Sequence, residues 1–349
     1  MFLCRLIMSS WNMGRVSTLI AVASGVSVVY LFHSVFYSSH TIFKTQTVFE
    51  SQTHLPGCLY LMTRYIYQSL RKKRGQMRKD KETNDELVFT VINCRYDGVS
   101  LRRFCSVSGY GWDYPDSVFR DLPLCFPEFL FKRLITMIVC SDRFLLSPSG
   151  LLVVSETVSL TEAVDELKKG PFSLQALVLD YRTASSGVEV DLTLRASRHQ
   201  RPVWSSTLTL LSPRNTHTPE AQPDLNITHD PASERCLSLA VSWSSAVRCA
   251  WLFDDVFGWW RFICPTAHPL WMFARCMAEM EKHKGVEVVR APLTVSVCYK
   301  QPVCFPRTVN IRVSENTSET TASFSMEEQR TGTLFISGQI KRQISEKAE

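Results

Sequence analysis

The sequence PTAHPLWMFARCMAEMEKHKG, residues 265–285, decides the fold. Its apolar residues recur at steps of three and four, which predicts one long helix with a buried face. Pro269 suits only a first turn, because it has no amide hydrogen to donate. Basic residues at 282–284 suit the end of a helix dipole, and Gly285 provides a stop. Since the chain beyond it, at 286–299 and 331–340, reads as strands, we expect a long helix wrapped by a sheet.

The chain is long enough for two domains and apolar enough to fold. It has 349 residues, 45% of them hydrophobic, and a net charge of +6. Residues 71–81 contain seven Lys or Arg and one Asp, so the positive charge is a local cluster. A local cluster gives little support for a nucleic-acid partner.

The cysteines do not predict a metal site. The sequence has 12 of them, none in a C-x-x-C pair and none spaced with His as zinc ligands are. Several lie inside predicted strands or helices, which favours buried thiols. We therefore expect neither a metal nor a cofactor.

An apolar run at residues 16–37 follows a tail at 1–15 and predicts a single transmembrane helix. At about 1.5 Å per residue it is long enough to cross a bilayer core of about 30 Å. A cleaved signal peptide is the alternative, although the run is long and ends in aromatic residues. The charges flanking the run favour neither orientation strongly, but the cluster at 71–81 suits an anionic cytosolic leaflet. We therefore predict a membrane protein with a cytosolic body.

Residues 38–84 form a predicted linker. Within it, residues 58–70 alternate apolar and polar side chains at helical spacing and run into the basic cluster. They fit an amphipathic helix on a membrane surface or a solvated linker helix equally well.

Two similar units follow, at residues 85–212 and 236–345, joined by a polar linker at 213–235 that is rich in proline. The first unit has a helix-length apolar stretch at 122–140. Predicted strands come after it at 151–160, 172–181, 188–196 and 203–211. The second unit repeats this plan, with a strand at 236–241, helical material, the long helix and more strands. The fold class expected from the pattern is α+β.

Three short motifs in the second unit carry a family resemblance. They are VFG at 256–258, TAHPLW at 266–271 and QPVCFP at 301–306. Their order and spacing resemble the MaoC-like acyl-thioester hydratase/dehydratase family. In the first unit, LPLCFP at 122–127 and VWSST at 203–207 also fit the two-domain members of that family.

The resemblance covers about residues 85–345 and implies a double hotdog, in which two long helices are each wrapped by an antiparallel sheet. It also implies an acyl thioester such as acyl-CoA as ligand. The two units would form a monomeric pseudo-dimer or belong to a homodimer.

The catalytic motif departs from the family. A catalytic Asp and His, five residues apart, are expected before the VFG motif. Ser244 stands at the Asp position, and Cys249, or Arg248 with a slip of one residue, stands at the His position. Hydration of an enoyl thioester needs a base for water and an acid for the α-carbon. The resemblance therefore implies a hydratase scaffold with a degenerate catalytic motif.

The remaining site candidates surround the start of the long helix. His268 precedes a helix N-terminus, where it would contact a thioester carbonyl or serve as a cap. Cys249 has two interpretations. It would be either a nucleophile that His268 activates or simply a buried thiol. Trp243 and Trp271 would line an acyl tunnel or pack in the core. His268, Trp271 and Trp243 are thus the expected substrate-binding residues.

Three functions remain open from the sequence. The first is acyl-thioester binding with lost hydro-lyase chemistry. The second is an acyl-CoA thioesterase, with Asp254 or Asp255 activating water. The third is a non-catalytic scaffold or lipid-binding module at the membrane.

Overall fold

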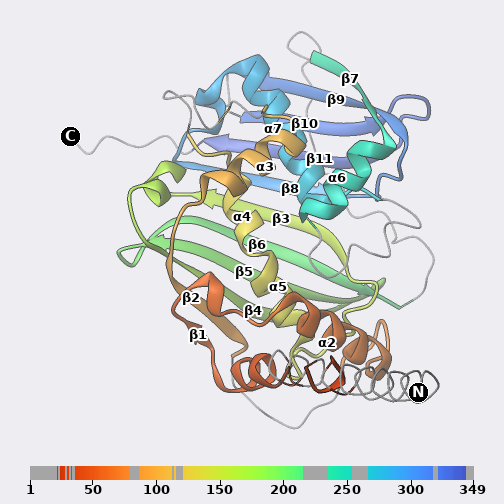
Figure 1. The fold of residues 1–349 in the computed structure, drawn as a ribbon. Helices are drawn as coiled ribbons and strands as arrows, with labels where there is room; N and C mark the ends of the chain where they lie inside the picture. The colour runs from red at the N-terminus through yellow and green to blue at the C-terminus, as the bar shows by residue number, and fades with distance from the viewer. Residues whose placement is uncertain are drawn as a thin grey trace, which may run out of the picture.

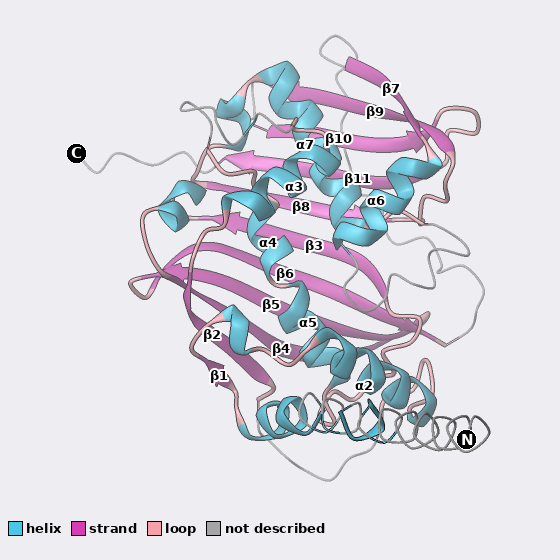
Figure 2. Ribbon diagram, viewed as in Figure 1, coloured by secondary structure: helices cyan, strands magenta, loops and turns pink. Residues whose placement is uncertain are grey.

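The protein is built on one continuous sheet covered by helices. The computed structural model describes residues 22, 24–27, 30, 33, 36–78, 86–111, 114, 121–214, 235–253, 266–316 and 321–342. The sheet has 11 strands in the order β1-β2-β4-β5-β6-β3-β8-β11-β10-β9-β7. Among the neighbouring strands in this order, only β1 and β2 run parallel to each other. Helices α3 to α7 form a layer over one face of this sheet (Figures 1 and 2).

The strands have the following bounds: β1 Val48–Phe49, β2 Val88–Cys94, β3 Leu152–Leu160, β4 Phe172–Ala184, β5 Gly187–Arg198, β6 Arg201–Pro213, β7 Arg235–Val241, β8 Leu293–Tyr299, β9 Arg307–Asn316, β10 Thr321–Glu328 and β11 Leu334–Arg342. The helices are α2 Cys58–Arg71, α3 Gly98–Ser108, α4 Phe126–Leu130, α5 Lys132–Cys140, α6 Trp243–Phe253 and α7 Pro269–Lys284. Short 3-10 turns lie at Gln52–His54, Val164–Lys168 and Val286–Val289.

The two halves of the sheet repeat one topology. The first half runs β2-β4-β5-β6-β3, and the second half runs β7-β9-β10-β11-β8. In each half, the second strand in sequence lies at the inner edge, and the helices come between the first and second strands. The halves meet where β3 pairs with β8, from Ser155 opposite Cys298 to Leu160 opposite Leu293.

Helix α7 confirms the prediction of a long central helix. His268 is its N-cap, Pro269 is its first residue, and Gly285 follows its last residue. Gly285 has φ 84°, which a residue without Cβ adopts at little cost. The prediction of a strand directly after it was wrong, because residues 286–289 form a 3-10 turn and β8 begins only at Leu293.

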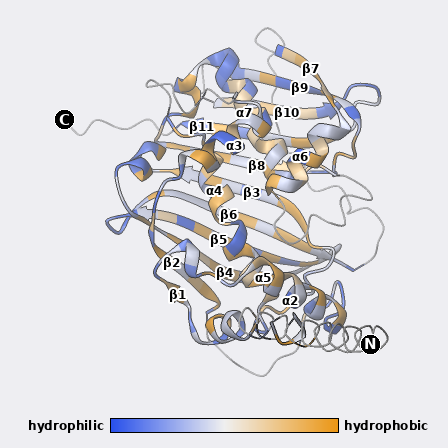
Figure 3. Ribbon diagram, viewed as in Figure 1, coloured by the Kyte–Doolittle hydropathy of each residue, from blue (hydrophilic) through white to orange (hydrophobic). Residues whose placement is uncertain are grey.

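The first half has a divided central helix where the sequence predicted one stretch. Helices α4 and α5 are separated by Phe131, whose amide donates to the carbonyl of Glu128 at 2.9 Å. That i to i−3 bond is a tight 3-10 turn, which changes the direction of the chain. Hydrophobic residues recur along α4, α5 and the strands behind them (Figure 3).

A glycine on β11 lets the second half of the sheet pack closely against α7. The ring of Phe324 on β10 stacks on Phe273 of α7, with centroids 5.9 Å apart. The same ring lies over Gly338 of β11, where an added Cβ would be 2.2 Å from Phe324 Cζ. Gly338 therefore leaves room for the ring that joins the sheet to the central helix.

The N-terminal part of the chain lies at the first-half end of the molecule. Residues 36–45 are helical and lie beside α2, where His40 Nδ1 and the hydroxyl of Tyr60 are 2.9 Å apart. Helix α2 in turn packs against α5. Among the helices described, none is long and apolar enough to cross a membrane. Most of the predicted anchor at 16–37 lies outside the described residues.

Candidate functional site

Helix α6 carries the positions where the catalytic pair was expected. Ser244 is exposed in its first turn, and its Oγ is 2.9 Å from Ser242 Oγ. Cys249 is 1% exposed on the inner side of the helix. Residues five apart on a helix are separated by about 140° around the axis. Ser244 and Cys249 therefore face different surroundings, and they do not form a pair directed at one substrate.

Two other candidates on α6 have less contact with the interior. Arg248 is exposed, and Trp243 at the helix start is 48% exposed. Residues 242–253 contain no Asp, Glu or His. Asp254 and Asp255, the thioesterase candidates, lie outside the described residues, as does the VFG motif.

His268 is held in one orientation at the start of α7. Its Nδ1 accepts a hydrogen bond from the amide of Leu270 at 3.1 Å, so the side chain caps the helix. Its half-buried ring stacks on Phe253 of α6, with centroids 5.6 Å apart. Because Nδ1 supplies a lone pair to the amide, the neutral ring carries its proton on Nε2. The imidazole is therefore oriented as a hydrogen-bond donor through Nε2.

Two of the family motifs are brought side by side. Thr266 forms an isolated antiparallel bridge with Cys304, and the amide of Ala267 donates to the carbonyl of Val303 at 2.7 Å. These contacts fix residues 266–268 against the turn at 301–306. The sequence order alone did not place these motifs together, since β8 separates them.

Trp271 packs in the core. It is 4% exposed, and its indole nitrogen donates to the carbonyl of Val107 at the end of α3 at 3.0 Å. Its ring meets Phe305 edge to face, with centroids 5.8 Å apart. Trp271 thus ties α7 to α3 and to the turn at 301–306.

An aromatic cluster joins three helices beside His268. It is formed by Phe104 of α3, Phe129 of α4 and Phe253 of α6, with centroids 5.6 to 5.9 Å apart. All three rings are buried. The cluster fills the space between the helices of the two halves and supports the ring of His268 through Phe253.

A buried acidic pair lies at the seam between the halves. The carboxyl groups of Glu128 on α4 and Glu156 on β3 are hydrogen-bonded to each other. Glu156 also accepts from Ser206 Oγ and from the hydroxyl of Tyr299, both at 2.9 Å. Burial raises the pKa of both carboxyl groups, and the charge of Glu156 raises the pKa of Glu128 further. The pair therefore holds a proton, with Glu128 as the neutral member.

Another buried carboxyl group, that of Glu281, is on α7. Glu281 accepts from the hydroxyls of Tyr110 at 3.1 Å and Tyr114 at 3.0 Å. It borders a cavity of about 10 Å³, which also touches Leu122 and Val164. That volume holds about one water molecule and is too small for an acyl chain.

These acids were not among the site residues predicted from the sequence, although the pattern contains a signal for them. Glu156 occupies the inward register of β3, between the buried residues Val154 and Val158. Glu281 lies one turn after Met277, on the apolar face of α7. An acidic residue in an apolar register predicts a buried, hydrogen-bonded carboxyl group.

Comparison with known proteins identifies the fold. No family model and no curated protein matches the sequence. HtdX (Rv0241c) of Mycobacterium tuberculosis is similar over 74% of this chain and 100% of its own, with 15% identity and a TM-score of 0.57. A MaoC-like dehydratase from Phytophthora capsici is similar over 74% of this chain and 95% of its own, with 14% identity and a TM-score of 0.55.

A third similar structure is full-length peroxisomal multifunctional enzyme type 2 from Drosophila melanogaster. The match covers 74% of this chain and 48% of that one, with 13% identity and a TM-score of 0.52. The protein thus has the α+β hotdog-like fold of MaoC-like dehydratases, and the resemblance seen in the sequence is confirmed at the level of the fold.

Proposed function

We propose that this protein binds an acyl thioester, such as an acyl-CoA, on a membrane-anchored double hotdog scaffold and does not hydrate it. The observation that carries the proposal is the pair of positions on α6. Ser244 is exposed and Cys249 is buried on another side of the helix. Neither a serine without a base nor a buried thiol activates water and protonates an α-carbon at neutral pH.

The start of α7 is the proposed binding point. Helix N-termini favour negative charge and polarised oxygens. Pro269 has no amide hydrogen, and the amide of Leu270 is bonded to His268. The Nε2–H group of His268 is therefore the proposed donor to the thioester carbonyl. The turn at 301–306 and the ring of Phe253 hold the imidazole in place.

Three measurements on the purified full-length chain test the proposal. Binding of acyl-CoAs is measured by calorimetry, hydration of crotonyl-CoA by loss of the enoyl absorbance, and hydrolysis by release of free thiol. Binding without hydration or thiol release is the expected result. Thiol release that is lost in Asp254→Asn or Asp255→Asn would instead identify a thioesterase.

Variants at His268 separate its ligand contact from its role as a cap. Asn also caps helices well, so His268→Asn keeps the cap and removes the imidazole. We expect this variant to fold and to lose acyl-CoA affinity, while Ser244→Ala and Cys249→Ala bind as the wild type does. Hydration that survives Ser244→Ala and Cys249→Ala but disappears in His268→Asn would overturn the non-catalytic proposal.

A further inference from the structure

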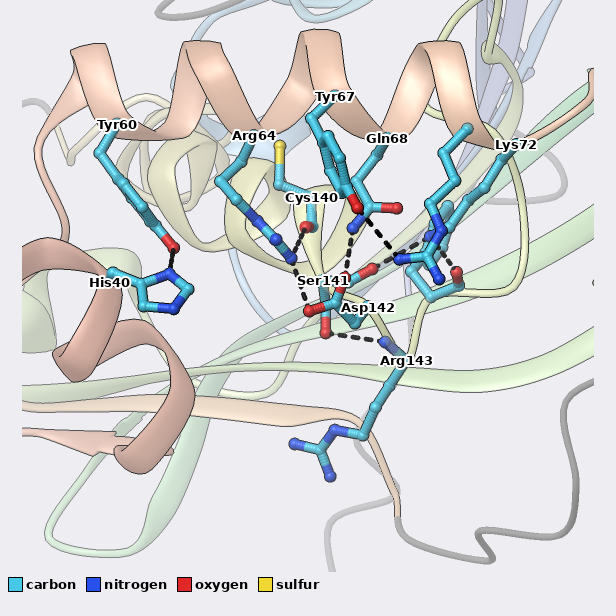
Figure 4. Close-up of polar contacts among 12 residues, drawn as sticks. His40, Tyr60, Arg64, Tyr67, Gln68, Lys72, Cys140, Ser141, Asp142 and Arg143 are labelled. Carbon is cyan, nitrogen blue, oxygen red and sulfur yellow. Dashed lines mark hydrogen bonds and ion pairs between the residues drawn. The ribbon is translucent and has the colours of Figure 1, made fainter. Parts of the chain in front are cut away.

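Helix α2 has an inner face that is fixed to the protein by polar contacts (Figure 4). Arg64 forms an ion pair with Asp142 at 2.8 Å, and Gln68 Nε2 donates to Asp142 Oδ1 at 2.6 Å. Lys72, just after the helix, donates its ammonium hydrogens to the carbonyls of Ser141 and Phe144. Helix α2 is therefore attached to the end of α5 and the turn that follows it.

The outer face of α2 carries exposed apolar side chains, which is unusual for a helix at the surface of a protein. Leu59, Ile66 and Leu70 are 64%, 36% and 84% exposed. Their spacing of seven and four residues places them in one stripe, with exposed Thr63 between them. We name Leu59, Thr63, Ile66 and Leu70 the outer stripe. Single exposed leucines need no explanation, but an aligned row of them marks an interaction surface.

The charged residues of α2 and of the segments that flank it are all basic. Residues 51–79 contain no Asp or Glu. Arg71 and Lys73 are exposed where the outer stripe ends, while Lys72 between them points inward. An apolar row beside basic side chains matches the boundary of an anionic bilayer, where acyl chains and lipid phosphates lie close together.

The neighbouring helix also exposes aromatic side chains. Phe36 and His40 contact Tyr60 of α2, so residues 36–45 lie beside α2 at the same end of the molecule (Figure 1). Tyr37 of that helix is 63% exposed, and Tyr30 before it is 70% exposed. Exposed aromatic residues of this kind suit the headgroup region of a membrane.

We propose that the outer stripe of α2, with Arg71 and Lys73, rests on an anionic membrane surface. The polar contacts of the inner face present the outer stripe on a folded, fixed helix, so contact with lipid requires no unfolding. Anionic lipids are concentrated in the cytosolic leaflet, and the proposal therefore places the body on the cytosolic side. It is independent of acyl-thioester binding at His268.

The test uses the full-length chain with vesicles of phosphatidylcholine, with or without phosphatidylserine. Because the run at 16–37 is nearly uncharged, its own lipid binding should not depend on phosphatidylserine. Arg71→Gln/Lys73→Gln is expected to lower affinity for serine-containing vesicles by about 30-fold, at about fivefold per charge, and to leave phosphatidylcholine binding unchanged. Ile66→Asn/Leu70→Asn is expected to lower the affinity for vesicles with and without phosphatidylserine by roughly tenfold.

Matched controls lie elsewhere on the surface. Leu179, 63% exposed on β4, is replaced by Asn, and the exposed Arg201 and Lys341 are replaced by Gln. These variants should bind as the wild type does, and thermal unfolding checks that every variant is folded. Equal wild-type affinity for the two vesicle types, or unchanged affinity in Arg71→Gln/Lys73→Gln, would overturn the proposal. So would a change in oligomeric mass in Ile66→Asn/Leu70→Asn without a change in lipid binding, since a second copy would then cover the outer stripe.

Discussion

Glu128 on α4 shares a hydrogen bond with Glu156 on β3, although ordinary carboxyl groups at neutral pH repel each other. Burial removes the water that would stabilise both charges, so the folded protein keeps a proton that the unfolded chain releases. A raised pKa in the folded state means that stability is greatest below the unfolded pKa of about 4.3 and falls as pH rises.

Replacement of Glu128 by Gln should reduce this pH dependence, because the amide does not titrate and still donates to Glu156. We expect the wild type to lose stability relative to Glu128→Gln from about pH 5 to about pH 8, by up to about 1.4 kcal/mol per pH unit. Urea unfolding across this range measures the difference. Glu287→Gln, at an exposed residue paired with Arg290, is the control and should run parallel to the wild type. Parallel curves for Glu128→Gln would contradict the shared proton.

Lys72 should produce the opposite pH dependence at alkaline pH. Burial lowers its pKa to about 8, while in the unfolded chain it is about 10.4. Between these values the unfolded chain binds more protons, so the stability of the wild type should rise with pH. Lys72→Met should flatten this rise, measured as the urea midpoint at intervals from about pH 8 to about pH 10. Lys73 is the exposed neighbour of Lys72, and Lys73→Met should keep the increase of stability with pH. Loss of that increase in Lys73→Met as well would assign the effect to another group.

Gly338→Ala should destabilise the second half. The added methyl group would lie 2.2 Å from Phe324 Cζ, and the ring cannot move without disturbing its stack on Phe273. A cost of about 1 to 3 kcal/mol in unfolding free energy is expected from such overpacking. Gly98→Ala is the matched control, because its nearest neighbour would be the hydroxyl of Tyr96 at 3.7 Å. An equal effect of the two changes would rule out the steric cause.

The cap of α7 can be tested through stability alone. His268→Ala removes the acceptor for the amide of Leu270 and should cost about 0.5 to 2 kcal/mol. His268→Asn should recover much of that loss, since Asn supplies an equivalent acceptor. Thermal unfolding of the two variants gives the comparison. If Asn failed to restore stability, the packing of the imidazole on Phe253 would be the larger contribution.

Introducing the residue types expected for a MaoC-like catalytic pair should not produce hydration. Ser244→Asp/Cys249→His supplies a carboxylate and an imidazole, but these positions lie about 140° apart on α6. We expect no hydration of crotonyl-CoA above the background rate, in a variant shown by thermal unfolding to be folded. Measurable turnover would mean that α6 rearranges when substrate binds.

The sequence predicted the periodic elements well. The stretch at 265–285 contains a cap, a first-turn proline, an apolar stripe and a glycine stop, and α7 follows these signals. Strands β3 to β6 lie where alternation and turn residues placed them, within a few residues at each end. Local preference and tertiary packing agree in these segments, which is why pattern alone located them.

Other features depend on contacts that sequence does not display. The division of the first central helix at Phe131 carries no sequence signal, because no proline or glycine stands at that position. The acidic pair requires α4 and β3 to be adjacent. The seam itself requires β3 to pair with β8, more than a hundred residues away in the chain. The transmembrane anchor at 16–37 stays a prediction.

The pairing of β3 with β8 has a consequence for how the molecule has diverged. Two separate copies joined at such an edge would dissociate on dilution, whereas covalent linkage keeps the local concentration of each half high for the other. A substitution in one half of the linked chain then changes that half alone. In a symmetric assembly of two identical chains, the same substitution would appear in both copies. An acidic pair centred on one half, and Ser244 and Cys249 on α6 of the other half, are compatible with this independence. The pairing of β3 with β8 can thus hold the two halves of the sheet together while their side chains differ.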